Sequence, residues 1–186
     1  MKGIKDFPVL VSERLLLREI SQTDIDDFFE IFGDYEVLKY YGMRPYKTSE
    51  DAGGFMGRLI NKFPTKTGIR WAITIKEHNE MIGTIGYKNW DTRSYKGEVS
   101  YELKPKYWNN GYITEALKKV VDFGFENGLN RIEAWDMAGN IASKRVLEKS
   151  GFTYEGTWRE HTYWDGKLYD IEWFSILKKE WEIGKL

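Results

Sequence analysis

Residues 104–117, "KPKYWNNGYITEAL", form a segment that could bind an anionic group. A proline, two asparagines and a glycine favour a loop here, and an amphipathic pattern that is typical of a helix follows at once. The first N–H groups of a helix lack partners within the helix and lie at the positive end of its dipole. The segment therefore predicts a phosphate or pyrophosphate site at Gly111, with a hydroxyl from Thr114 and positive charge from Lys104 and Lys106.

A plain loop in front of a capped helix would show the same spacing, so the pattern alone leaves both interpretations open. The segment matches neither G-x-G-x-x-G nor G-x-x-x-x-G-K-[ST]. The nucleotide-binding motifs of those other folds are therefore not supported.

The chain has 186 residues, of which 41% are hydrophobic and 31% charged. This mixture predicts one domain over residues 1–186, without repeats or linkers. A net charge of −1 does not favour nucleic acid as a partner. The opening "MKGIKDFPVL" lacks a signal-peptide pattern, and no apolar run is long enough to cross a membrane. We therefore expect a cytoplasmic protein without a membrane partner.

Cysteine is absent, and the two histidines, His78 and His161, lie far apart in the sequence. Cysteine nucleophiles and thiolate metal sites are therefore excluded, and we expect no metal.

The hydrophobic patterns predict alternating strands and helices, with Gly or Asn residues at several helix ends. Residues 34–46 are aromatic and irregular. The order β-α-α-β-β-β-α-β-α-β-β predicts an α/β fold in which helices cover a mixed sheet. The predicted strands are residues 14–20, 69–76, 81–90, 98–104, 131–137, 152–164 and 168–177, and the predicted helices are residues 24–32, 49–63, 113–127 and 141–150.

Four segments in this order resemble the GNAT superfamily of N-acetyltransferases, and within it the RimJ/RimL-like branch. They are "SERLLLREISQTD", "YGMRPYKTSEDA", "GEVSYELKPKYWNNGYITEAL" and "NIASKRVLEKSGFTYEGTWRE". The resemblance covers roughly residues 12–178. It implies a single GNAT-like domain, whose mixed sheet of about six to seven strands splays into a V and is flanked by about four helices.

The resemblance also implies that acetyl-CoA is the cosubstrate. In the superfamily a Q/R-x-x-G-x-G/A loop wraps the CoA pyrophosphate; here Trp108 replaces the Arg or Gln, and Ile113 replaces the small residue. The backbone from Tyr101 to Leu103 would pair with the pantetheine arm. Asn140 would contact pantetheine, although a plain helix N-cap explains it equally well. The implied cofactor-binding residues are Tyr101, Glu102, Leu103, Trp108, Asn109, Asn110, Gly111, Tyr112, Ile113, Thr114, Asn140 and Ser143.

By the same resemblance, the Leu103 amide would polarise the thioester carbonyl, and Ser143 would lie near the CoA sulfur. Ser143 could equally be an ordinary serine of a first helical turn. An attacking amine needs a base, and the branch places a Glu at position 98. Since Glu98 and Leu103 are five residues apart, they face opposite sides of a strand unless a bulge intervenes, which favours a water relay.

Other carboxylates and one imidazole are alternative bases. Glu102 lies on the same predicted strand, and Glu160 and His161 lie in the closing hairpin. Ordinary surface charge would explain each of these side chains as well. Thr162 stands where some ribosomal-protein members have a Glu, which puts a ribosomal substrate in doubt.

The expected function is acetyl transfer from acetyl-CoA to a primary amine, such as a protein N-terminus. A small-molecule amine (a polyamine, amino acid or aminoglycoside) and a CoA-binding module without catalysis are the alternatives. Residues 34–46 would border the acceptor cleft, where Asp34 and Glu36 could attract a cation. A homodimer is possible, since similar proteins form dimers.

Overall fold

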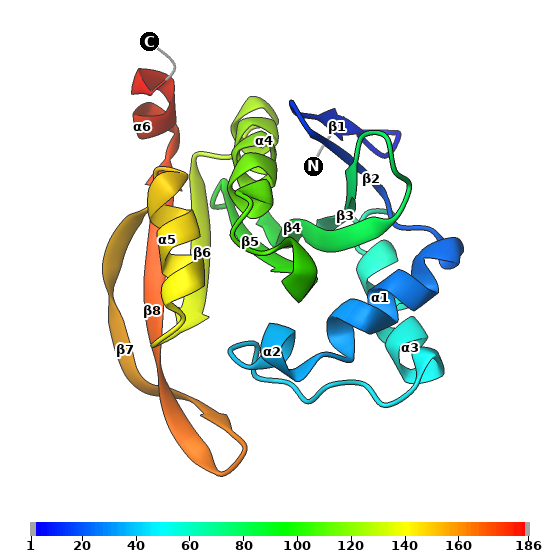
Figure 1. Cartoon of the computed structure of the whole chain (residues 1–186). Helices are drawn as coiled ribbons and strands as arrows, with labels where there is room; N and C mark the ends of the chain where they lie inside the picture. Colours follow the sequence, from blue (N-terminus) through cyan, green and yellow to red (C-terminus); the bar gives the residue numbers. More distant parts are fainter. Residues whose placement is uncertain (1–2, 185–186) are drawn as a thin grey trace.

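One eight-stranded sheet organises the chain in the computed structural model, which describes residues 3–184 (Figure 1). The strand order is β1-β2-β3-β4-β5-β6-β8-β7. The sheet is mixed, as expected, but it has one strand more than the six to seven predicted. The strands are β1 (Leu10–Val11), β2 (Leu15–Glu19), β3 (Ile69–Ile75), β4 (Met81–Asp91), β5 (Lys96–Leu103), β6 (Arg131–Met137), β7 (Thr153–Trp164) and β8 (Lys167–Leu177).

Four helices of eight or more residues match the four predicted helices. They are α1 (Ile25–Phe32), α3 (Ser49–Ile60), α4 (Tyr112–Glu126) and α5 (Ile141–Lys149). The structure adds α2 (Tyr35–Leu38), α6 (Lys178–Ile183) and the 3₁₀ turns η1 (Gln22–Asp24) and η2 (Pro105–Tyr107). These elements are too short to show a hydrophobic period. No helix within residues 3–184 is long and apolar enough to cross a membrane.

Strands β5 and β6 form the parallel pair of the sheet, and they pair over a short distance. Lys96, Gly97 and Glu98 of β5 lie opposite Arg131, Ile132 and Glu133 of β6, respectively. Beyond Glu98 the two strands diverge, and Figure 1 shows the opening toward its lower edge. The V predicted between the central strands is confirmed.

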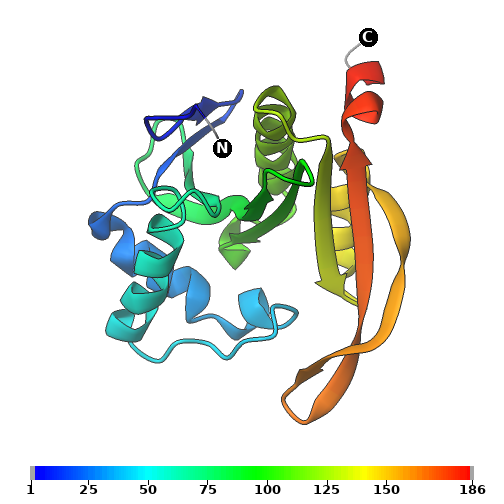
Figure 2. The same ribbon diagram turned by 180° about the vertical axis from the view of Figure 1, so that it is seen from behind.

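The two faces of the sheet carry separate groups of helices, as the views from front and back show (Figures 1 and 2). Helices α4 and α5 pack over one hydrophobic cluster, and α1 and α3 pack over another. Within the first cluster, the hydroxyl of the buried Tyr87 donates to the carbonyl of Val120 at 2.8 Å. Gly124, one turn later on α4, leaves room for that ring.

A bulge lies opposite the vertex of the V, but in β4 rather than in β5. Tyr87 pairs with Val99 and Asn89 pairs with Glu98, so Lys88 is the extra residue. Since β5 itself runs without a bulge, Glu98 and Leu103 lie on opposite faces of their strand.

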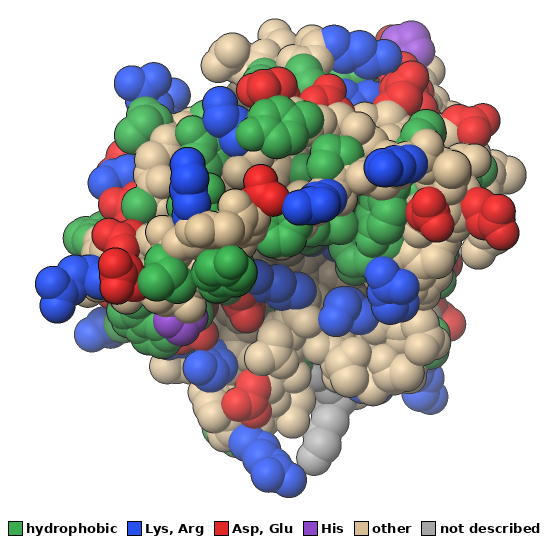
Figure 3. Space-filling model, turned by 90° about the horizontal axis from the view of Figure 1, so that it is seen from below, with side chains coloured by type: hydrophobic (Ala, Val, Ile, Leu, Met, Phe, Trp, Pro, Cys, Tyr) green, Lys and Arg blue, Asp and Glu red, His purple; other side chains and the backbone are tan. Residues whose placement is uncertain are grey.

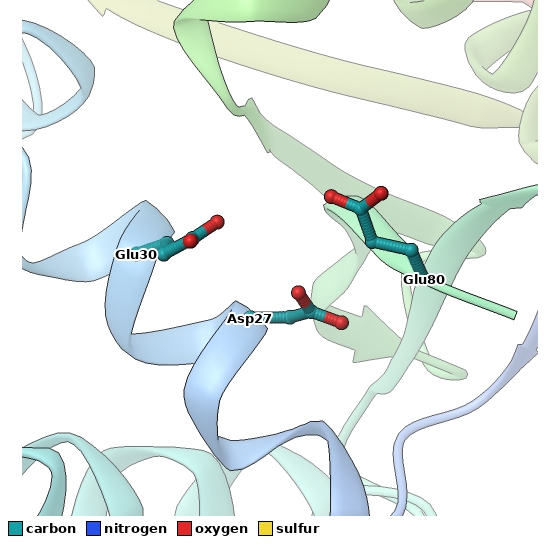
Figure 4. A group of neighbouring side chains, drawn as sticks. All are labelled: Asp27, Glu30 and Glu80. Carbon is teal, nitrogen blue, oxygen red and sulfur yellow. The ribbon is translucent and has the colours of Figure 1, made fainter.

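Lys104, directly after β5, ties the end of that strand to α1 and to the β3–β4 turn. Its side chain is 3% exposed, and its Nζ lies 2.7 Å from Asp27 Oδ1, 2.5 Å from Glu30 Oε2 and 3.1 Å from Glu80 Oε1. Figure 4 shows the three carboxylates converging. Their ligand atoms lie within 4.8 Å of one another, as in a cation site. Here the ammonium supplies the positive charge.

Glu80 extends the same network into the loop before α4. It accepts hydrogen bonds from Lys106 Nζ at 2.8 Å and from Tyr107 Oη at 3.0 Å. The hydrogen bond from Lys106 is the main cause that lowers the pKa of Glu80 to about 2. Both lysines that the sequence assigned to a phosphate are therefore paired with carboxylates, and the loop entrance is fixed to the scaffold.

We predict opposite effects of an added methyl group at two helical glycines. A Cβ at Gly124 would lie 2.0 Å from Tyr87 Oη, so Gly124→Ala must displace a buried ring and its hydrogen bond. We expect a loss on the order of 2–4 kcal/mol in the free energy of unfolding, measured by denaturant titration.

Gly54→Ala in α3 is the matched control, since nothing lies within 4 Å of its Cβ position. Alanine is the better helix former, so this variant should gain about 0.5–1 kcal/mol. Equal stability of the two variants would contradict the packing described for α4.

Lys104→Met should destabilise the fold by roughly 1–3 kcal/mol at neutral pH, because three converging carboxylates lose their shared cation. The loss should shrink as the pH falls below the usual range of a Glu carboxyl toward the lowered pKa of Glu80, about 2, because a protonated Glu80 no longer attracts the ammonium. Lys106→Met is the control: its side chain is 56% exposed, and we expect a loss of about 1 kcal/mol or less. Thermal unfolding from about pH 2.5 to 7 measures both. A pH-independent loss in Lys104→Met would argue against the carboxylate cluster as the cause.

Candidate functional site

Two cavities of about 620 Å³ and 280 Å³ lie at the opening of the V. Figure 3 views this end of the molecule from below, where Lys and Arg side chains surround a recess. The cavities share the lining residues Val37, Tyr40, Tyr101, Asn140 and Ser143. They therefore adjoin where β5, α5 and the segment after α2 approach one another.

The loop before α4 presents bare backbone to the larger cavity, as the sequence predicts. Asn109 has a φ of 61° and Gly111 a φ of 76°, both left-handed. Gly111 is the N-cap of α4, and no side chain caps the first turn. Both residues line the larger cavity together with Tyr112, Ile113 and Thr114. The N-terminus of a fifteen-residue helix is thus open to an anion on this side.

The register of β4 and β5 turns the Leu103 amide toward the opening. Leu103 lies opposite Gly83, and the adjacent Lys104 N–H donates to the Ile82 carbonyl at 2.9 Å. This pattern makes Leu103 and Gly83 a pair without mutual hydrogen bonds, so the Leu103 N–H and C=O point away from β4. Strand β6 has already diverged at this level.

The backbone carbonyl of Leu103 is hydrogen-bonded to the side chain of Trp108. Its indole Nε1 donates to the Leu103 carbonyl at 2.8 Å. The Trp that replaces the family's Arg or Gln therefore links the anion-binding loop to the end of β5. The Leu103 N–H is left facing the V.

Arg14 is a residue of this loop that the sequence analysis missed. Its Nη1 donates to the Asn110 carbonyl at 3.1 Å, and its guanidinium lies 4.6 Å from the centre of the Tyr112 ring. Its Nε donates at 2.7 Å to Glu115, which neutralises the one acidic side chain in the first turn of α4. The hydrogen bonds join residues 96 and 101 positions apart, so no local pattern could have shown them.

Three further cationic residues line the larger cavity: Lys39 after α2, and Arg145 and Lys149 on α5. In the part of the chain that the structure describes, they take the place that the sequence analysis gave to Lys104 and Lys106. The positive charge that faces the cavity comes from α5 and from the residue after α2 rather than from the loop.

A polar chain crosses the V between its two arms. Tyr101 Oη on β5 lies 2.7 Å from Ser143 Oγ on α5, and Asn140 Nδ2 donates to Asp136 Oδ1 on β6 at 2.9 Å. Burial raises the pKa of Asp136 to about 6, although hydrogen bonds from Ser143 and Asn140 oppose the shift. Asn140 is also the N-cap of α5, because its Oδ1 accepts from the Ser143 N–H at 3.3 Å.

Asp136 was missed by the sequence analysis, although the sequence holds a signal for it. Along β6 the buried positions alternate, and Ile132, Ala134 and Asp136 share one face. An acidic residue on the buried face of a strand is unusual unless it is partnered. The side chain lines the smaller cavity.

Glu98 and Glu102 have ionic partners on the face opposite Leu103. Glu98 lies 2.6 Å from Lys88 Nζ at the vertex of the V. Glu102 is 1% exposed and is paired with Arg70, with a further hydrogen bond from Thr84 at 2.7 Å. The Glu102 carboxylate thus belongs to a buried ion pair, and only the backbone of this residue lies along the edge of the cleft.

Glu160 and His161 lie on the exposed outer part of β7. Neither lines the two cavities among the described residues. The Glu160 N–H donates to Asp170 at 2.8 Å, and the His161 ring packs on Trp158. Of the sequence-predicted residues, the structure thus brings together Tyr101, Leu103, Asn140, Ser143 and most of the loop. Glu98, Asn110, Glu160 and His161 line neither cavity.

Comparison with known proteins relates this geometry to a family. Residues 14–153 match the model of the acetyltransferase (GNAT) domain. An uncharacterized N-acetyltransferase, YoaA of Bacillus subtilis, is 38% identical over 92% of this chain and 98% of its own. A GNAT-family acetyltransferase structure from Bacillus anthracis superposes with a TM-score of 0.83 at 26% identity, covering 92% of this chain and 99% of that chain.

A structure of RimL, the ribosomal L7/L12 alpha-N-protein acetyltransferase, in complex with coenzyme A has the same fold. Its TM-score is 0.83 at 17% identity, and the match covers 91% of this chain and 98% of RimL. The chain belongs to the GNAT family of N-acetyltransferases, in its RimJ/RimL-type branch.

Proposed function

We propose that this protein transfers the acetyl group of acetyl-CoA to a primary amine, and that the amine is a protein N-terminus. The observation that carries the proposal is the Leu103 N–H, which points into the V beside an uncapped helix N-terminus. RimL, whose fold this chain shares, binds coenzyme A and modifies such an N-terminus.

The larger cavity would hold the cofactor. Its pyrophosphate would lie on the backbone from Asn109 to Tyr112, with Arg14 behind the loop and Arg145 and Lys149 across the cavity. Its pantetheine arm would pair with the edge of β5 at Tyr101 and Leu103, which point their backbone groups away from β4.

The Leu103 amide would then donate to the thioester oxygen, which becomes an oxyanion as the amine attacks. A fixed backbone donor stabilises this charge without reorganising during the reaction. Ser143 lines both cavities and would place its hydroxyl near the departing sulfur.

The smaller cavity would receive the acceptor amine. Tyr40, Tyr41 and Trp135 contribute to its walls. A volume of about 280 Å³ also suits a small amine, so a polyamine, amino acid or aminoglycoside is the second candidate.

A thiol-release screen tests the activity: the protein is given acetyl-CoA with N-terminal peptides and, separately, with small amines. Free CoA above the rate without acceptor identifies the class. Peptides blocked at the N-terminus are the matched control for an N-terminal acceptor. Tight acetyl-CoA binding without release on any amine would instead indicate a CoA-binding module.

Gly111→Asp should weaken acetyl-CoA binding about tenfold to a hundredfold, because it adds like charge next to the phosphate and places a side chain at a left-handed φ of 76°, which strains the loop. Isothermal titration calorimetry measures the affinity. Gly166→Asp is the control: Gly166 also has a left-handed φ, 84°, with open space around it, in the β7–β8 turn. Unchanged affinity in a folded Gly111→Asp variant would overturn this placement of the cofactor.

A further inference from the structure

We propose that Asp136 and Ser143 form a proton relay, in which Asp136 takes the proton of the attacking amine and Ser143 delivers it to the departing thiolate. The inference rests on the proposed acetyl transfer and goes beyond it. It assigns a base on β6, a strand on which the sequence analysis placed none.

The relay joins the two cavities. Asp136 lines only the smaller cavity, where the acceptor would lie, whereas Ser143 lines both cavities. A proton that enters at Asp136 and leaves at Ser143 therefore crosses from the acceptor side to the cofactor side. No other carboxylate lines the smaller cavity among the described residues.

Asn140 holds the two ends of the relay side by side. Its Nδ2 donates to Asp136 Oδ1 at 2.9 Å, and its Oδ1 accepts from the Ser143 N–H at 3.3 Å. An ionised carboxylate only accepts hydrogen bonds, so Asp136 is ready to take up a proton. Tyr101 Oη lies 2.7 Å from Ser143 Oγ, and either hydroxyl can donate to the other.

Tyr101 acts as a positioning residue. Burial raises the pKa of its hydroxyl well above the usual range, so it stays neutral and keeps its proton. Its contact orients Ser143 across the V.

The proton balance is closed within the site. The neutral amine attacks the thioester carbon, and the C–N bond forms while nitrogen becomes positively charged. The nitrogen then gives one proton to the Asp136 carboxylate. As the C–S bond breaks, Asp136 returns a proton to Ser143 Oγ and Ser143 gives its own to the thiolate. The products are the amide and the free thiol of CoA, and both side chains regain their starting states.

The surroundings of Asp136 make its ionisation measurable. Tyr101, Asn140 and Ser143 approach it, and Glu172, which pairs with Lys144 at 3.7 Å, faces it from β8. Burial is the main cause of its pKa of about 6, and the Glu172 charge raises the pKa further. Because the base must be ionised, activity should fall as the pH drops through about 6.

The test compares Asp136→Asn with Glu172→Gln in kcat and kcat/KM from pH 5 to 9, by thiol release. Asp136→Asn should lower kcat about a hundredfold or more, with the KM for acetyl-CoA nearly unchanged, and it should remove the limb near pH 6. Glu172→Gln, outside both cavities, should keep the full rate and move the limb to lower pH, because a like charge is lost.

Ser143→Ala should lower kcat without weakening acetyl-CoA binding, and Ser143→Thr, which retains a hydroxyl, should recover part of the rate. These variants keep the relay testable if Asp136→Asn does not fold. Three results would each overturn the relay. The first is an acidic limb of the pH profile that does not move in Glu172→Gln, and the second is full activity of Ser143→Ala. The third is an acidic limb that is lost in Glu98→Gln but kept in Asp136→Asn.

Failure of the proposed function has a different signature. The wild-type protein would then release no CoA with any amine, and the relay would fall with it. Wild-type turnover with an unaltered Asp136→Asn profile removes the relay alone and leaves acetyl transfer standing.

Discussion

The short parallel contact between β5 and β6 is the constraint on which the rest of the structure depends. Only three residues of each strand pair, and the cavities begin where the pairing ends. The gap stays open because each arm is held from outside. Strand β6 pairs with β8 along its whole length, and β5 pairs with β4 and ends at the buried Lys104. Beyond Glu98, β5 and β6 are each stabilised by their other neighbouring strand. Backbone groups that face the opening can therefore stay unpaired while the sheet remains intact.

Electrostatic pairing decides which charges are available in the cleft. The chain is nearly neutral, yet its cations have separate roles. Lys88, Lys104 and Arg70 are bound to carboxylates of the scaffold, whereas Arg145 and Lys149 line the larger cavity. Lys39 also lines it, 3.9 Å from Glu36. The cationic residues next to the anion-binding loop in the sequence are thus not the ones that lie across the cavity from it in the structure. The ion pairs position the backbone, and residues from α5 provide the field.

Local sequence patterns predicted the parts of the site that local physics controls. Strand β6, the N-cap Asn140 and the loop at Gly111 follow from alternation, capping and turn chemistry. Contacts between distant segments were beyond such patterns: the Arg14 pair with Glu115, the partners of Lys104 and the bulge at Lys88 all depend on tertiary packing. Short elements such as β1 and α2 were missed because two or four residues hold no period. Asp136 was visible in the alternation of β6 but was not recognised.

The orientation of the Leu103 amide has an evolutionary consequence. A backbone N–H belongs to every residue except proline, so its presence does not depend on the side chain at position 103. The group persists through most substitutions there, provided that the strand keeps its register with Gly83. Mutational drift can therefore reshape the walls of the smaller cavity while the main-chain donor stays in place. A scaffold of this kind can diversify its substrates without rebuilding the part that is common to them.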